Sequence, residues 1–271
     1  MKHFAHYIKR TVVDAAVVSC SSSNELPYAE RQPGDQGFRS PAYHSVPTNS
    51  GVASRVRDGD TIWLFSQLSS PWGTLTPSLD AMIKVSKIER SEGSATRYRF
   101  VATVDSKWYP LFNANELISN LKAIDAASTV RDLLNTPRTT IGQALQFLRE
   151  ISDPSPLVEH EAKITSMKHD FISYRMIDGT KSAFELAKVL LENYRSVFWD
   201  RWSLPRRLAE RANNVEPNAL DSHIAEAIMN SRAVWGVLSQ QYAIDGSYSK
   251  LEKGLAIGVG KFRPYPPWND G

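Results

Sequence analysis

Cysteine is almost absent from this chain of 271 residues: Cys20 is the only one. A single cysteine excludes an internal disulfide framework, and neither a CxxC zinc site nor a cysteine-ligated iron–sulfur cluster can be built from it. The six histidines are scattered and form no HxxxH or HExxH motif. The sequence therefore points away from disulfide-stabilised secreted scaffolds and from these metalloenzyme classes.

Strong charge of one sign and long apolar runs are lacking as well. Lys and Arg number 32 against 29 Asp and Glu, for a formal net charge of +3, whereas a protein that binds mainly nucleic-acid phosphates is usually more basic. No uninterrupted apolar stretch reaches the length of a membrane span. The apolar run before Cys20 looks like a lipoprotein signal, but Asp14 interrupts it, so we expect a β-strand there and a cytoplasmic protein.

The composition is that of a globular protein, with 42% hydrophobic, 23% charged and 10% aromatic residues. The length suits one large domain or two of ordinary size. Pro154 and Pro156, together with Ser and Asp, favour a break in the chain. We therefore predict a β-rich N-terminal domain over residues 1–152, an extended linker over 153–164 and a second domain over 165–271.

Before the break, β-branched and apolar runs predict strands over 11–18, 61–65, 82–88 and 98–104. Helical spacing predicts helices over 115–124 and 140–151, the second capped by Thr140. Residues 21–57 are rich in Ser, Pro, Asn and Gly, which predicts a long loop with a binding role.

After the break, strand and helix alternate. Buried strands are predicted over 170–174, 196–199 and 233–238, and helices over 182–194, 221–231 and 250–259. This alternation predicts an α/β fold in which a parallel sheet is flanked by helices on both faces. Ligands of such sheets bind beyond the carboxyl ends of the strands.

Polar and aromatic residues follow each of these strands. They are Tyr174, Arg175 and Asp178 after the first, Asp200 to Pro205 after the second, and Ser239, Tyr242, Ser247, Tyr248 and Glu252 after the third. Aromatic rings stack on bases, guanidinium groups bind phosphate, and a lone carboxylate stabilises a sugar cation. The set therefore favours a nucleotide ligand.

The order of these residues resembles a TIR domain over about residues 165–265. The resemblance rests on Phe171 to Arg175, Val197 to Asp200, Ala227-Ile228 with Ser231, Val237 to Ser239 with Tyr242, and Ser247-Tyr248 with Glu252. Tyr248 stands where the family usually has Trp, and Glu252 follows at the family's spacing. The loop after the second strand lacks the family's glycine, and the last strand and helix are expected to be reduced or absent.

The resemblance implies a flavodoxin-like fold and an NAD+ glycohydrolase or cyclase with NAD+ as substrate and no separate cofactor. Glu252 is the implied catalytic carboxylate. The implied substrate-binding residues are Ser173, Tyr174, Arg175, Asp200, Trp202, Leu204, Tyr242, Ser247 and Tyr248. Self-association through the TIR domain and a role in bacterial anti-phage defence, controlled by the N-terminal domain, are implied too.

Plainer interpretations stand beside these. Glu252 lies between Lys250 and Lys253, a pattern typical of a solvated, salt-bridged glutamate. Asp200 suits a turn cap, and Trp202 suits packing within its loop. Two other functions stay open. One is a self-association module without enzymatic activity, in which the loop at Arg201–Arg211, with Arg206 and Arg207, docks partners. The other is a different N-glycosidic enzyme such as a nucleoside deoxyribosyltransferase.

The first segment vaguely resembles a PUA-like barrel of the EVE or ASCH type, through residues 59–65, 83–88 and 100–110. The resemblance implies an aromatic pocket for a nucleotide or a modified nucleic-acid base. Trp63, Trp72, Trp108 and Tyr109 are its candidate rings, although Trp63 is better interpreted as core. Arg31, Arg39 and His44 lie in the long loop, which is a candidate lid.

Overall fold

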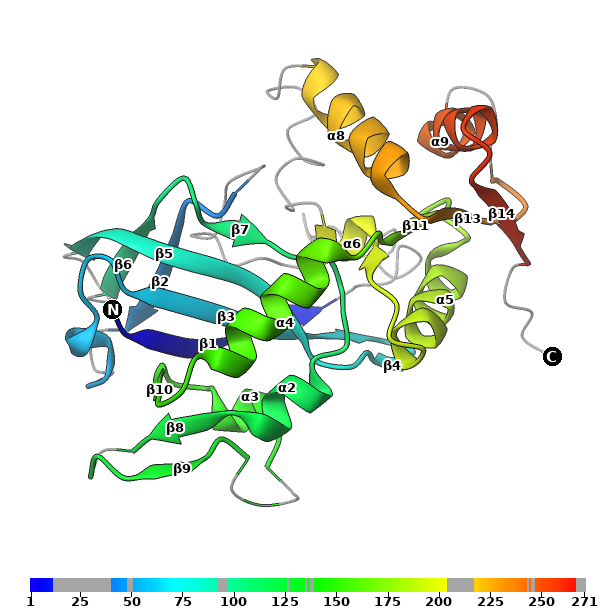
Figure 1. Ribbon diagram of the computed structural model, residues 1–271. Helices are drawn as coiled ribbons and strands as arrows, with labels where there is room; N and C mark the ends of the chain where they lie inside the picture. Colours follow the sequence, from blue (N-terminus) through cyan, green and yellow to red (C-terminus); the bar gives the residue numbers. More distant parts are fainter. Residues whose placement is uncertain are drawn as a thin grey trace, which may run out of the picture.

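The computed structural model describes residues 1–11, 40–47, 51–91, 97–125, 127–134, 136, 139–203, 217–242, 244 and 247–266. Its strands form two separate sheets, one of ten strands and one of four (Figure 1). All strands of the larger sheet lie before residue 152, and all four of the smaller sheet lie after residue 169. The organisation of the strands therefore changes in the region where the prolines predict a break.

The larger sheet consists of β1 (His3–Thr11), β2 (Tyr43–Pro47), β3 (Thr61–Ser70), β4 (Gly73–Thr74), β5 (Ser78–Ser91), β6 (Arg97–Ala102), β7 (Lys107–Trp108), β8 (Lys122–Ile124), β9 (Val130–Asp132) and β10 (Arg149–Ile151). Its main order is β2-β6-β5-β3-β1-β10-β8-β9. β1 and β3 pair in parallel, and the other pairs are antiparallel. The short helices η1 (Ala53–Arg55), α2 (Asn115–Asn120) and α3 (Ile141–Ala144) complete this part. PUA-like topology stays a prediction.

The smaller sheet is wholly parallel and has the order β12-β11-β13-β14. Its strands are β11 (Asp170–Ser173), β12 (Val197–Phe198), β13 (Ala233–Val237) and β14 (Phe262–Tyr265). In chain order this is 2-1-3-4, the start of the flavodoxin-like doubly wound order. β14 pairs with β13 over four residues and is the fourth strand of this order. The expectation that the last strand and helix of a full TIR domain are reduced or absent stays a prediction.

Helices cover both faces of this sheet. In Figure 1, α8 (Pro217–Asn230) and α9 (Tyr248–Gly258) lie on one side and α5 (Thr180–Glu192) on the other. The alternation of β11 explains this: Phe171 packs with Ile228 of α8, and its neighbour Ile172 packs with Phe184 of α5. The predicted mixed α/β fold with a parallel sheet between helices is confirmed at this level.

The predicted linker is a helix, α4 (Ser155–Ser166), so the expectation of an extended linker over 153–164 is wrong. Pro154 is the N-cap and Pro156 lies in the first turn, where proline's missing N–H is not needed. Leu157 and Ile164 are buried in the core of the first segment. The prolines therefore start a helix instead of interrupting structure.

The predicted helix over 140–151 is only partly correct. Thr140 caps it with a complete capping box, but α3 ends at Ala144. Residues Arg149–Ile151 form β10, which pairs with both β1 and β8. The apolar residues that set the predicted helical pattern are buried even so. Strand pairing, not the local helical pattern, determines the backbone conformation of residues 149–151.

One hydrophobic core cluster spans the two segments. Leu68, Leu75 and Leu111 of the first segment pack in the same cluster as Phe184 and Trp199 of the second. Leu111 and Val197 exchange backbone hydrogen bonds of 3.0 and 2.8 Å. The parallel sheet is therefore anchored on the N-terminal part. Among the described residues, no helix combines the length and apolar character of a membrane span.

A candidate active site at the carboxyl ends of the parallel strands

Ser173 and Glu252 meet at the carboxyl edge of the parallel sheet. Ser173 ends β11 and is fully buried, and its Oγ donates a 2.6 Å hydrogen bond to Oε2 of Glu252 on α9. The hydroxyl of Tyr242 lies 3.0 Å from the same Oγ. Because Ser173 has a single proton and gives it to the carboxylate, Tyr242 donates to Ser173. The chain Tyr242–Ser173–Glu252 thus ends on a charge-assisted bond to the ionised acid.

A second carboxylate lies beside this chain. Asp200 follows β12 as the first residue of α6 (Asp200–Ser203). Its Oδ1 accepts a 2.7 Å hydrogen bond from the hydroxyl of Tyr174, the residue after β11. Tyr174 is buried, and its ring meets Trp199 edge-on at a centroid distance of 6.2 Å. Five of the residues predicted from sequence therefore converge at this edge: Ser173, Tyr174, Asp200, Tyr242 and Glu252.

The environment of Glu252 disfavours its charge. Burial is the largest influence and, with the nearby charge of Asp200, raises the pKa of Glu252 to about 7, against the opposing effect of the Ser173 hydrogen bond. Burial likewise raises the pKa of Tyr242 to about 12, so its hydroxyl is a neutral donor at physiological pH. A carboxyl group with such a pKa, in a group of polar side chains, is a candidate for function.

The surrounding loops are tied to one another. Asp178, after β11, accepts hydrogen bonds from the Ser239 hydroxyl (2.7 Å) and the Gln241 backbone N–H (2.8 Å), both after β13. Gly236 on β13 leaves room for the site: a Cβ there would lie 2.6 Å from the Tyr242 hydroxyl and 2.5 Å from the Phe262 ring. Any larger residue would displace the group that orients Ser173.

The other predicted site residues occupy different positions. Ser247 is buried and serves as the N-cap of α9, accepting a hydrogen bond from the Lys250 backbone N–H. Tyr248, the next residue, is 50% exposed. Arg175 is partly buried, and its Nε has no hydrogen-bond partner among the described groups. Leu204 lies outside the described residues.

The prediction that Trp202 stacks on a ligand is not supported by its position. Its ring is fully buried, its Nε1 donates to the carbonyl of Tyr109 at 2.9 Å, and the Arg10 guanidinium lies 4.0 Å from the ring centroid. A ring with both contacts inside the core has no face open to a base. Trp202 therefore packs the loop, as the plainer interpretation proposed.

The four rings proposed for an aromatic pocket in the first segment lie in three different apolar clusters. Trp63 and Tyr109 are buried in one apolar cluster, Trp72 packs against a second, and Trp108 packs against a third. Trp63 is a core residue, as expected. His44 is also buried, on β2, with its Nε2 2.8 Å from Nδ1 of His6. Arg31 and Arg39 lie outside the described residues.

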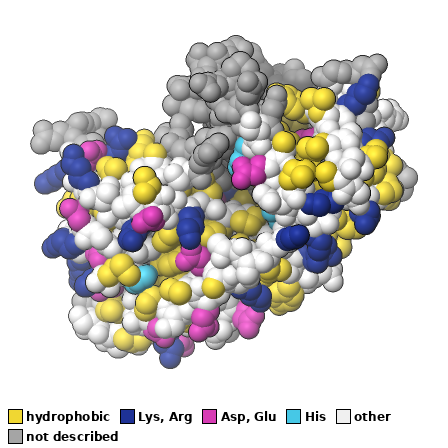
Figure 2. Space-filling view, turned by 45° about the horizontal axis from the view of Figure 1, so that its top comes forward, with side chains coloured by type: hydrophobic (Ala, Val, Ile, Leu, Met, Phe, Trp, Pro, Cys, Tyr) yellow, Lys and Arg dark blue, Asp and Glu magenta, His cyan; other side chains and the backbone are white. Residues whose placement is uncertain are grey.

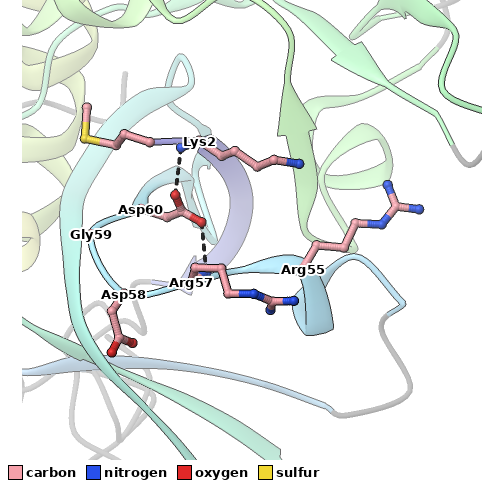
Figure 3. Close-up of a pocket in the computed structure, with 7 residues that line it drawn as sticks. Lys2, Arg55, Arg57, Asp58, Gly59 and Asp60 are labelled. Atoms are coloured by element: carbon pink, nitrogen blue, oxygen red, sulfur yellow. Dashed lines mark hydrogen bonds between the residues drawn. The ribbon is translucent and has the colours of Figure 1, made fainter.

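A pocket does open elsewhere in the first segment, lined by Met1, Lys2, Arg55, Arg57, Asp58, Gly59 and Asp60 (Figure 3). Asp60 accepts hydrogen bonds there from the backbone N–H groups of Lys2 (2.7 Å) and Arg57 (2.8 Å). The side chains of Lys2 and Arg55 already pair with Glu150, at 2.6 and 3.8 Å. Two of the cations that line this pocket are therefore already paired within the protein.

Glu252 predicts a measurable dependence of stability on pH. Between its ordinary value of 4.5 and about 7, the folded protein binds a proton that the unfolded chain has lost. Stability is therefore lost as the pH rises through this range, by on the order of 3 kcal/mol. The neutral Glu252→Gln variant escapes this loss. We expect its melting temperature to exceed that of the wild type by several degrees at pH 8 and by much less at pH 5.

Calorimetry at the two pH values checks this expectation. Glu192→Gln is the matched control, because it removes an exposed carboxylate from α5. A Glu252→Gln variant less stable than the wild type at pH 8 would show that the carboxylate is not held in a charge-disfavouring environment.

No family model matches the chain, and no curated protein matches it.

Proposed function

We propose that this protein is an NAD+ glycohydrolase or cyclase in which Glu252 faces the ribose of the nicotinamide–ribose bond. The observation that carries the proposal is the Glu252 carboxylate itself: partly buried at the carboxyl edge of a parallel sheet, it is held by the Ser173 hydroxyl at 2.6 Å. The strand order 2-1-3-4 and the TIR-like order of residues support it. A solvated, salt-bridged glutamate would have neither the buried partner nor the raised pKa.

The chemistry needs one carboxylate. When the ribose–nicotinamide bond breaks, its electron pair moves to the pyridinium nitrogen and nicotinamide leaves as a neutral molecule. No general acid is required, and the positive charge that develops on the ribose is stabilised by the ionised Glu252. Water then adds to the anomeric carbon and loses a proton, giving ADP-ribose. Attack by an atom of the adenine or second ribose gives a cyclic product instead.

The neighbouring residues supply binding. Tyr242 and Ser173 orient the carboxylate, and Tyr174 with Asp200 forms the adjacent wall. Arg175 offers a guanidinium to phosphate or ribose hydroxyls, and Tyr248 offers an exposed ring for stacking. We propose in addition that the protein assembles through its TIR-like part, that its first segment senses a nucleotide or modified nucleic acid, and that the activity serves defence of a bacterial host against phage.

Charge on the one face that Figure 2 shows fits a small ligand better than a long polyanion. On the face shown in Figure 2, basic, acidic and apolar side chains are interspersed. A nucleic-acid groove would need a continuous basic stripe.

The purified full chain incubated with NAD+, at low and high protein concentration, tests the proposal. We expect nicotinamide together with ADP-ribose or its cyclic form, separated by chromatography, at a rate that grows faster than linearly with concentration. Purine and pyrimidine deoxynucleosides are the comparison substrates. Turnover of nucleosides with intact NAD+ would favour a deoxyribosyltransferase, and turnover of neither would favour a scaffold.

A further inference from the structure

A buried ion pair in the first segment reaches the one-turn helix that carries Asp200. Arg10 on β1 and Asp80 on β5 are both fully buried, and Nη1 of Arg10 lies 3.0 Å from Oδ1 of Asp80. The other oxygen of Asp80 accepts a 3.0 Å hydrogen bond from the Ser66 hydroxyl. Burying two charges costs free energy because both lose their contact with water. The best-attested role of such a pair is to fix the arrangement of other groups.

Arg10 also holds Trp202. Its Nη2 donates to the Trp202 carbonyl, and its guanidinium carbon lies 4.0 Å above the centroid of the Trp202 ring. The indole Nε1 donates to the Tyr109 carbonyl, so residues of the first segment contact the ring on two sides. Trp202 is two residues after Asp200 in α6. The position of Asp200 is thereby set by the N-terminal sheet.

Asp200 in turn faces the Glu252 site. It accepts the hydrogen bond of Tyr174, and Tyr174 directly follows Ser173, the donor to Glu252. The titratable groups around Glu252 are Asp200 from the segment after β12, Tyr242 from the segment after β13, and Lys250 and Lys253, its neighbours on α9. Of these, Asp200 is the one that the N-terminal sheet holds through α6.

We infer that the Arg10–Asp80 pair is a positioning element: by clamping Trp202 it holds Asp200 and Tyr174 in place beside Glu252, so that the first segment sets the state of the site. This inference rests on the proposed function of Glu252. It gives the N-terminal sheet a direct physical route to the site, since a ligand that moves β1 or β5 relative to α6 would displace Asp200.

The test replaces the charged pair by apolar residues of similar size, Arg10→Met with Asp80→Leu, which often leaves a fold intact. The free energy of unfolding is measured against pH for each protein and for the same protein carrying Glu252→Gln. The pH midpoint of the difference between the two curves reports the titration of Glu252 and needs no enzymatic activity. We expect this midpoint to fall by about one pH unit in the apolar pair, because Asp200 no longer adds its charge. Asp200→Asn alone should shift it in the same direction.

The two changes should not add. Asp200→Asn in the apolar-pair background should shift the midpoint much less than it does in the wild type, because its effect has already been lost. Phe100→Leu is the control: it disturbs the same sheet within a core cluster that contains neither Tyr109 nor Trp202, and it should leave the midpoint unchanged. If the apolar pair does not fold, Trp202→Phe is tested in its place. This variant keeps both charges of the Arg10–Asp80 pair and should shift the midpoint in the same direction by a smaller amount.

An unchanged midpoint in the folded apolar pair, or in Trp202→Phe where that pair does not fold, overturns the inference. Full additivity with Asp200→Asn overturns it as well. For NAD+ cleavage we expect kcat to fall about tenfold in the apolar pair. A wild type that leaves NAD+ intact defeats the proposed function, whereas the midpoint still decides whether Arg10 positions the site.

Discussion

Glu252→Gln is expected to lower the rate of nicotinamide release by about three orders of magnitude, with the protein still folded. The amide keeps the size of the side chain and can still accept the hydrogen bond that Ser173 now gives at 2.6 Å. What it loses is the negative charge next to the developing ribose cation, and removal of one such stabilising group costs roughly 10²- to 10³-fold or more in rate. The expected loss therefore lies in kcat, with a smaller change in KM.

The measurement compares initial rates of nicotinamide release at pH 8 for the wild type, Glu252→Gln and Glu192→Gln. Glu192 is exposed at the end of α5 and controls for the loss of one carboxylate. Equal rates in the wild type and Glu252→Gln would remove Glu252 from its role. A loss of the same size in Glu192→Gln would show that removing a carboxylate far from the site lowers the rate as much as removing that of Glu252.

The second large effect is expected at the opposite edge of the parallel sheet. Asp170, at the start of β11, is fully buried and receives a two-pronged contact from Arg195, at 2.8 and 2.7 Å. Arg232 donates to it at 2.9 Å and the Trp235 indole at 3.0 Å. Asp170→Asn removes the negative charge that all these donors share. It also replaces one of the two accepting oxygens by an NH2 group, which cannot accept a hydrogen bond from them. We expect the free energy of unfolding to fall by about 3 kcal/mol.

Urea unfolding measures this loss, with Asp105→Asn as the control. Asp105 is exposed and pairs with Lys84 at 3.5 Å, so its neutralisation should change stability far less. A similar small change for Asp170→Asn would mean that the buried network around β11 contributes little to holding the sheet together.

Local pattern was enough to locate three strands of the parallel sheet, β11, β12 and β13, but not β14. The short run of β11, buried on both faces, and the amphipathic spacing of α5 each reflect surfaces that must be buried, which a single sequence records directly. The same logic placed Tyr174 and Glu252 at one edge, because strands of a parallel sheet end together, whereas Ser173 came from the TIR resemblance. The hydrogen bond between Ser173 and Glu252, and the part of Tyr242, required the three-dimensional contacts.

Contacts across the two segments were beyond sequence reasoning. Arg10 gave no signal, since nothing in its neighbourhood marks it as buried or names Asp80 and Trp202 as partners 70 and 192 residues away. Trp202 was assigned to a ligand because it follows a strand, although its ring faces the first segment. The helix α4 was missed because proline was interpreted as a breaker, although it is tolerated in a first turn.

The pH dependence of nicotinamide release by the wild-type chain tests the central claim most directly, namely that ionised Glu252 drives cleavage of the N-glycosidic bond. The pKa of Glu252 is raised to about 7, so the rate should be constant above that pH and fall with decreasing pH below it. At pH 5.5 it should be about thirtyfold lower than at pH 8.5. A rate that stays level down to pH 5, or that rises as the pH falls, would contradict the account.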